Sequence, residues 1–62
     1  MCESSVFVER GGKRELLMED VVHVAVATGN GIKLTGILGE TREAQGRITE
    51  INLLTHTIVI TA

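Results

Sequence analysis

Val21-Val22-His23-Val24-Ala25-Val26-Ala27-Thr28 is the stretch that decides the fold of this 62-residue chain. Side chains of a β-strand point alternately to two faces. One face is expected to carry Val22, Val24 and Val26, and the other Val21, His23, Ala25 and Ala27. Gly29-Asn30-Gly31 follows, and these residue types tolerate the positive φ of a tight turn. Residues 32–38 then predict the partner strand, with Ile32, Leu34 and Leu38 turned inward.

The amino-terminal side of this pair predicts a β-hairpin. Residues 5–9 read Ser-Val-Phe-Val-Glu, a β-rich strand, and Gly11-Gly12 suits a tight turn. Residues 14–18 would return as the second strand, with a break at the acidic pair Glu19-Asp20. A short helical turn over residues 14–21 is the alternative, because Glu, Leu and Met favour helix.

The carboxy-terminal side predicts two further strands. Residues 39–43 are polar and fit either a loop tip or the exposed start of a strand, and residues 44–51 resume the β pattern. Gly36 and Gly46 interrupt their strands. Gly36 predicts a bulge or a sharp bend, and Gly46 predicts another bend. Residues 52–56 form a loop whose Leu53 and Leu54 are expected to plug one end of the barrel. Residues 57–61 read Thr-Ile-Val-Ile-Thr, a strand that must be paired inside the sheet or across a dimer, because an exposed edge of this kind aggregates.

Five to seven short strands linked by glycine-containing turns predict an all-β fold. We expect a small antiparallel barrel or a curled meander, in one domain over residues 1–62. A chain of this length has a small core and commonly needs a disulfide, a metal or self-association for stability. Its single cysteine cannot form an internal disulfide, so a homodimer is expected.

Composition argues against several classes of function. Eight acidic and six basic residues give a net charge of −2, and Phe7 is the only Phe, Tyr or Trp. Nucleic-acid binding depends on clustered cations and stacking aromatics, so this balance argues against it. The sequence contains no apolar run of membrane-spanning length and no signal-peptide pattern. We therefore expect a cytoplasmic protein with a reduced thiol.

The inventory of reactive side chains argues against catalysis and against zinc. His23 lies in a predicted strand and His56 in a predicted loop, and no local pattern pairs either with Cys2 as a nucleophile and base. A structural zinc site needs four Cys or His ligands, commonly in close-spaced pairs. The chain is therefore predicted not to be an enzyme.

Cys2 is the candidate metal ligand. If Met1 is removed, the thiolate of Cys2, its free amine and the backbone nitrogen of Glu3 can form fused chelate rings. If Met1 stays, the amine of Met1 and the amide nitrogen of Cys2 can join the thiolate instead. Soft sulfur with nitrogen donors in a plane suits Ni(II) or Cu(II). One chain supplies only two or three donors, so two copies would complete a square-planar set around one metal per dimer. The alternatives are an ordinary small apolar residue, an incidental exposed thiol, or a redox-sensing thiol resolved by the Cys2 of a second copy.

Residues along the whole chain resemble one family. The opening Met1-Cys2-Glu3-Ser4, the Val-Phe-Val strand, the Gly-Gly turn, and residues 17–21, 46–48 and 51–54 together look like the CooT family. The resemblance implies a homodimeric, β-rich, nickel-binding accessory protein that serves maturation of carbon monoxide dehydrogenase. It implies Ni(II) bound through Cys2 at the dimer interface, with carbon monoxide dehydrogenase or its maturation proteins as partners.

Two other interpretations stay open at this point. Small hydrogenase-maturation chaperones of the HypC type also begin Met-Cys, but their opening usually continues with proline, which this chain lacks. The alternative function is a small β-barrel used as an RNA-binding or protein-docking module. An exposed basic stripe would favour RNA, and the residues available for it are Arg10, Lys13, Arg14, Lys33, Arg42 and Arg47.

Overall fold

Strands form where β-branched residues alternate with polar ones, as the sequence predicts. The computed structural model describes residues 3–62, and in that range it contains six strands and no helix. The strands are β1 (Ser4–Arg10), β2 (Lys13–Val26), β3 (Gly31–Gly36), β4 (Thr41–Gln45), β5 (Arg47–Asn52) and β6 (Thr57–Thr61). The all-β prediction of five to seven short strands is confirmed.

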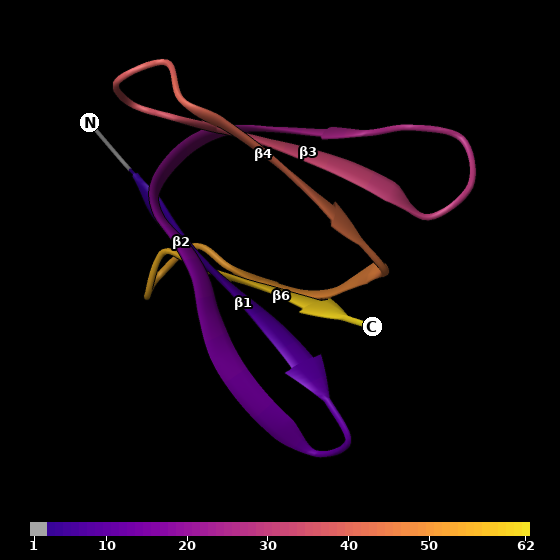
Figure 1. Cartoon of the computed structure of the whole chain (residues 1–62). Helices are drawn as coiled ribbons and strands as arrows, with labels where there is room; N and C mark the ends of the chain where they lie inside the picture. Colours follow the sequence, from indigo (N-terminus) through magenta and orange to yellow (C-terminus); the bar gives the residue numbers. More distant parts are fainter. Residues whose placement is uncertain (1–2) are drawn as a thin grey trace.

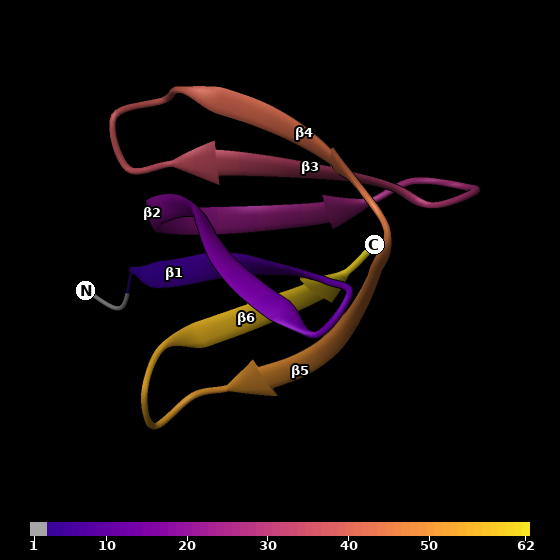
Figure 2. The same ribbon diagram turned by 60° about the horizontal axis from the view of Figure 1, so that its bottom comes forward.

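The strands form one curled sheet in the order β4-β3-β2-β1-β6-β5 (Figures 1 and 2). Over residues 3–62 the two edge strands, β4 and β5, share no ladder, so the sheet does not close into a barrel. Of the two predicted forms, the closed barrel is not found, and the sheet is open and curled. All neighbouring pairs are antiparallel except β1 and β6, which run parallel.

The parallel pair was not predicted, and it places the last strand inside the sheet. Ser5 pairs with Thr57 and Glu9 with Thr61, while β5 covers the other side of β6. The prediction that residues 57–61 are paired is therefore confirmed. Pairing on both sides removes the exposed edge that such an apolar strand would otherwise present.

The predicted break at Glu19-Asp20 occurs as a bend within one long strand. β2 pairs with β1 up to Val21 and with β3 from Val21 onward. Asp20 has a φ of 56°, a left-handed conformation that redirects the chain. The alternative of a helical turn over residues 14–21 is wrong, because the whole segment lies in β2.

The core lies between the two arms of this bent sheet. Its buried members are Val6, Val8, Val21, Ile32, Leu34 and Ile60. A register irregularity between Val21 and His23 interrupts the alternation, so Val21 and Val24 both contribute to the core. The predicted division of this strand into two faces is therefore wrong at Val21, because the irregularity brings Val21 to the same side as Val24.

Predictions for three leucines are wrong. Leu38 was expected inward, yet it is 89% exposed because β3 ends at Gly36 and the chain turns away from the core. Leu53 and Leu54 were expected to plug one end of the fold, yet they are 77% and 93% exposed. On β5 and β6, Ile48 and Ile58 pack against the core instead.

Gly46 separates β4 from β5 and confirms the predicted bend. It has a φ of 143°, and its backbone nitrogen donates to the carbonyl oxygen of Asn30 at 2.9 Å. A Cβ built at this position would lie 2.6 Å from the carbonyl oxygen of Thr61. The stretch predicted as one strand over residues 44–51 is thus two strands, joined where only glycine fits.

Candidate functional site

The predicted ligand, Cys2, lies outside the described residues, as does Met1. The site is therefore described from Glu3 onward, and the assignment of Cys2 and the neighbouring backbone nitrogens as metal donors stays a prediction. What the structure describes is the surface around the start of β1.

Hydrogen bonds hold the start of β1 on both sides. The backbone nitrogen of Ser5 donates to the carbonyl oxygen of His56 at 2.8 Å. On the other side, Ser4 pairs with Val21 at the bend of β2. The chain is thus fixed to the sheet within a few residues of its first residue, because both neighbours of β1 are already in register there.

Two loops extend the same end of the molecule. The β3–β4 loop, residues 37–40, is attached to the bend of β2, because the nitrogen of Ile37 donates to the carbonyl oxygen of Asp20 at 2.9 Å. The β5–β6 loop, residues 53–56, is attached to β1 through His56. Figure 2 shows the two loops on either side of the start of β1. We call residues 3–5, 19–22, 37–40 and 53–56 together the amino-terminal end.

Side-chain oxygens order both loops from within. The Oε1 atom of Glu40 accepts from the backbone nitrogen of Leu38 at 3.1 Å. The Oδ1 atom of Asn52 accepts from the backbone nitrogens of Leu54 and Thr55, at 3.0 and 3.1 Å. Such caps replace water at backbone donors in tight turns. The exposed leucines are therefore carried by ordered turns.

Within residues 3–62, the histidines do not assemble with acidic residues into a metal site. His23 is exposed on β2 opposite Thr35, and His56 is half-buried at the end of the β5–β6 loop. Across residues 3–62, no group of three or more His, Cys, Asp or Glu side chains is placed to hold a metal ion. His56 has a φ of 53°, and its carbonyl oxygen accepts the hydrogen bond from Ser5.

Charge is divided between the two ends of the molecule. The amino-terminal end carries Glu3, Glu19, Asp20 and Glu40 and neither lysine nor arginine. All six basic residues lie elsewhere, and three of them, Arg10, Lys13 and Arg14, belong to the β1–β2 hairpin at the opposite end.

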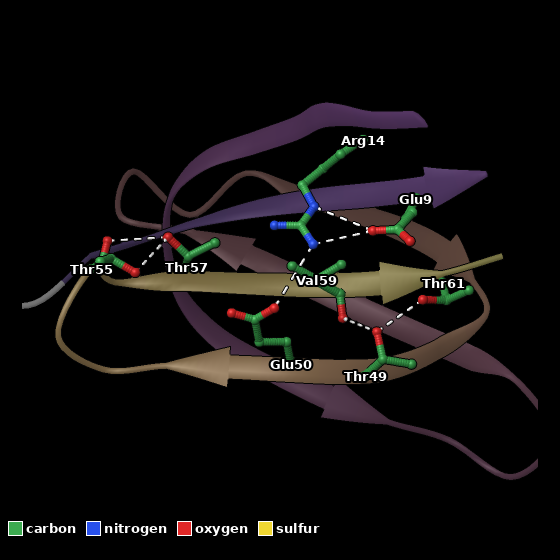
Figure 3. A network of polar contacts seen from close by, with 8 residues as sticks. All are labelled: Glu9, Arg14, Thr49, Glu50, Thr55, Thr57, Val59 and Thr61. Carbon is green, nitrogen blue, oxygen red and sulfur yellow. Dashed lines mark hydrogen bonds and ion pairs between the residues drawn. The ribbon is translucent and has the colours of Figure 1, made fainter. Parts of the chain in front are cut away.

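Contacts within the chain engage two of the six basic residues from which an RNA-binding stripe would have to be built. Arg14 lies 3.1 Å from an Oε1 atom of Glu9 and 3.8 Å from that of Glu50, as Figure 3 shows. Arg42 donates to the carbonyl oxygen of Leu17 at 3.2 Å. Two of the six cations therefore already have partners within the chain. This further weakens the case for an RNA-binding surface, which needs cations free to contact phosphates.

A hollow of about 440 Å³ lies beside the core, between residues of β1, β2 and β4. Its lining residues are Val8, Arg10, Leu17, Arg42, Glu43, Ala44 and Gln45. They include neither a cysteine nor a histidine. Separately, the residues described include no helix long and apolar enough to cross a membrane.

Comparisons with known proteins find similarity over most of the chain. The sequence profile of the family described as CO dehydrogenase accessory protein CooT matches residues 1–61. An uncharacterised protein of Methanothermobacter thermautotrophicus is 43% identical over 60 residues, covering 97% of this chain and 88% of that protein. An uncharacterised protein of Archaeoglobus fulgidus is 44% identical over 43 residues, covering 69% and 93%.

A solved structure extends the likeness to three dimensions. The crystal structure of a protein assigned as CooT from Carboxydothermus hydrogenoformans superposes with a TM-score of 0.87 at 30% sequence identity. The match covers 97% of this chain and 95% of that one. The curled sheet described above is thus similar to a fold already seen by crystallography.

Proposed function

The chain belongs to the CooT family of CO dehydrogenase accessory proteins, and we propose that it is a non-enzymatic, cytoplasmic protein that binds Ni(II) for maturation of carbon monoxide dehydrogenase. The observation that carries this proposal is the family match over residues 1–61, which includes Cys2. The nickel ion is cargo in this proposal, to be captured and passed on to carbon monoxide dehydrogenase or to its maturation proteins.

Cys2 is the proposed ligand, through its thiolate, its own backbone nitrogen and the backbone nitrogen of Glu3. This donor set fits Ni(II), which accepts thiolate sulfur and nitrogen in a square plane. Two residues of extended chain span at most about 7 Å, so a metal held by Cys2 stays near the anchored Ser4. The hydrogen bond between Ser5 and His56 supports the proposal because it fixes the point from which the donors extend.

A second copy of the chain is proposed to complete the coordination. One Cys2 with its backbone nitrogens supplies two or three donors, while a square-planar ion takes four. Two copies supply two thiolates and two nitrogens, so the proposed species is a homodimer that holds one nickel ion between its amino termini.

Nickel titration of the Cys2→Ser variant tests the proposal. The thiol-reduced parent is expected to bind about one Ni(II) per two chains and to show thiolate-to-nickel charge-transfer absorption, since four donors complete the site. Cys2→Ser should keep the circular dichroism of the parent and lose both signals. His23→Asn is the matched control, because it removes an exposed imidazole and should leave binding unchanged. Equal nickel affinity in Cys2→Ser and the parent would show that the assignment is wrong.

Transfer of the metal tests the role in maturation. Parent protein loaded with Ni(II) should raise the activity of nickel-free carbon monoxide dehydrogenase faster than the same amount of Ni(II) with the Cys2→Ser variant. Both reactions contain a weak nickel chelator, which suppresses loading by free metal. Equal rates in the two reactions would argue against delivery through Cys2.

A further inference from the structure

The strand β4 forms one edge of the sheet and is bonded on one side only. Within residues 3–62 its ladder runs to β3 alone, and that ladder has no bulge. The other edge strand, β5, has a register irregularity between Ile48 and Glu50. Bulges and prolines commonly keep edge strands from pairing with other chains, and β4 has neither. The outer edge of β4 is therefore suited to accept another strand.

The hydrogen bonds of β4 show which of its backbone groups are unused. At its two ends, the carbonyl oxygen of Glu40 and the nitrogen of Gly46 are bonded to backbone groups at the ends of β3. In an antiparallel pair, residues alternate between bonding to the neighbouring strand and pointing away from it. Arg42 and Ala44 therefore bond to β3 as well. The backbone groups that point to the outer edge belong to Thr41, Glu43 and Gln45.

The 440 Å³ hollow lies along this free edge. It is lined by residues 42–45, four consecutive residues of β4. Consecutive side chains of a strand point to opposite faces, so a hollow that touches all four residues lies beside the edge of the strand. A second hollow, of about 210 Å³, is lined by residues 15–17 of β2 and shares Arg10 and Arg42 with the first. The space thus extends from the edge of β4 to the first half of β2.

Within residues 3–62, no strand of the chain fills this space. The first half of β2 pairs with β1, and β2 pairs with β3 only from Val21 onward. Arg42 bridges the gap by donating to the carbonyl oxygen of Leu17 at 3.2 Å. Because an arginine side chain fits between them, the two backbones are farther apart than the about 4.8 Å of paired strands. Figure 1 shows the β1–β2 hairpin and the β3–β4 pair diverging from the bend of β2.

Positive charge faces this space. Arg10 lies two residues after the buried Val8 and so points to the core-facing side of β1. Lys13 pairs with Arg10 across the hairpin, and residues directly opposite in a ladder share a face. Arg42 lies opposite a buried leucine of β3 and shares that face as well. The three cations outnumber Glu15, the carboxylate that pairs with Val8 on the same side.

Glu43 also lines the hollow, but its side chain belongs to the other face of β4. It pairs with Lys33 of β3, and both residues are exposed. The charge of Glu43 is therefore balanced by a neighbour on its own face. A segment that enters the space meets a net positive charge on the core-facing side.

We propose that the outer edge of β4 is a docking site for an extended acidic segment of another protein. The segment adds to the sheet as a strand, bonded to the outward backbone groups of Glu43 and Gln45. Its carboxylates contact Arg10 and Arg42, since a guanidinium binds a carboxylate through paired N–H donors. Arg42 has further N–H donors beyond the one that bonds to Leu17. The inference goes beyond the proposed function and depends on neither nickel nor the amino terminus.

Other occupants satisfy fewer of these groups. In a second copy, β4 reads Thr-Arg-Glu-Ala-Gln over residues 41–45. Pairing two such edges brings further arginines to a side that already carries net positive charge, and like charges so close are unfavourable. A small organic acid can bind the arginines but leaves the outward N–H groups of the edge unpaired. An acidic strand pairs with both, in the manner of strand addition to a free sheet edge.

Amide hydrogen exchange, followed by nuclear magnetic resonance, tests the inference on the parent protein. The probe is a peptide with blocked ends, in which threonine and glutamate alternate over about six residues, a common strand length. In the free protein, the amides of Glu43 and Gln45 should exchange faster than those of Arg42 and Ala44, which bond to β3. Saturating peptide should slow exchange at Glu43 and Gln45 about tenfold or more. The same peptide with lysine in place of glutamate should not bind, because its charges repel the arginines.

Variants at the edge separate the backbone contact from the charge contact. Glu43→Pro removes an outward N–H and no bond to β3, so it should raise the dissociation constant of the peptide about tenfold or more. An edge strand tolerates such a proline, and circular dichroism checks the fold. Glu43→Ala is the matched control, because it keeps the N–H and should bind at least as tightly as the parent.

The charge contact has its own pair of variants. Arg10→Gln should raise the dissociation constant about threefold or more and weaken its dependence on salt. Arg47→Gln removes an exposed arginine from β5, at the other edge of the sheet. It should change the constant less than about twofold.

The inference is wrong if the peptide does not bind, if it binds without slowing exchange at Glu43 and Gln45, or if Glu43→Pro binds it as the parent does. Slow exchange at these two amides in free protein that becomes faster on dilution would assign the edge to a second copy and overturn the inference. Equal spectral changes with succinate in place of the peptide would assign the hollow to a small acid and overturn it too. Cys2→Ser should bind the peptide as the parent does, so this test is independent of the nickel experiments.

Discussion

The backbone nitrogen of Ser5 donates a hydrogen bond to the carbonyl oxygen of His56, with 2.8 Å between the two atoms. His56 reaches this position with a φ of 53°, in the left-handed region that few residue types other than glycine adopt. The contact ties the start of β1 to the β5–β6 loop. It depends on the backbone of His56, not on its imidazole.

Substitutions at His56 should separate the backbone role from a metal-binding role. His56→Val should lower the free energy of unfolding by about 1–2 kcal/mol, because a β-branched residue is strained at positive φ. His56→Asn should stay within about 0.5 kcal/mol of the parent, since asparagine tolerates this conformation. Urea unfolding measures both. His56→Asn should also bind nickel as the parent does, and a loss of affinity would identify the imidazole as a ligand.

Replacing Gly46 with alanine should lower the free energy of unfolding more than the same change at Gly39. Gly46→Ala is expected to lower the free energy of unfolding by about 3 kcal/mol or more, because it combines positive φ with overpacking. The added Cβ would lie 2.6 Å from the carbonyl oxygen of Thr61 and 2.9 Å from Cγ2 of Ile60.

Gly39→Ala is the matched control for this prediction. Gly39 has a φ of 91°, and an added Cβ meets nothing within 4 Å. Only the conformational cost applies there, about 1–2 kcal/mol. Thermal or urea unfolding of the two variants gives the difference. Equal losses would mean that the close approach of β6 to the β4–β5 junction is not important.

The fold was largely predictable because its turns are set by local chemistry. Gly11-Gly12, Gly29 and Gly46 all have positive φ and all mark chain reversals or bends that the sequence places correctly. Alternation identified the strands, since Val6 and Val8 are buried on one face. The parallel pairing of β1 with β6 could not be predicted from the sequence, because residues so far apart in the chain leave no local signal of their register.

The errors at the three leucines have a common physical origin. Hydrophobic side chains were assumed to be inside, yet Leu38, Leu53 and Leu54 are held outward by turn contacts. A signal was available for two of them, because Asn52 directly precedes the leucine pair and asparagine commonly caps the backbone two residues on. The predicted metal ligand, Cys2, lies outside the described residues and stays a prediction.

Asn52 should control the order of the β5–β6 loop. Asn52→Ala removes the acceptor that binds the nitrogens of Leu54 and Thr55, so it should lower the free energy of unfolding by about 1 kcal/mol. Hydrogen exchange at these two amides should become faster. Asn52→Asp keeps a side-chain oxygen at the same position and should preserve slow exchange. Unchanged exchange in Asn52→Ala would show that other contacts order the loop.

A destabilising substitution at Leu34 should allow the stabilisation by bound nickel to be measured. It is fully buried on β3, between Val24 of β2 and Arg42 of β4. Leu34→Ala leaves a cavity and should cost about 2–5 kcal/mol. A domain of this size rarely has more than about 3–5 kcal/mol in total, so metal-free Leu34→Ala should be largely unfolded at 37 °C.

Nickel should restore the Leu34→Ala variant, because a ligand that binds only the folded state stabilises it. The gain is about 2.7 kcal/mol at a free metal concentration one hundred times the dissociation constant. Circular dichroism at 37 °C, with and without Ni(II), measures the recovery. The double variant Cys2→Ser/Leu34→Ala has the same cavity but lacks the proposed ligand, so added nickel should leave it unfolded. Recovery of both variants to the same extent would place the nickel at another site and contradict the role of Cys2.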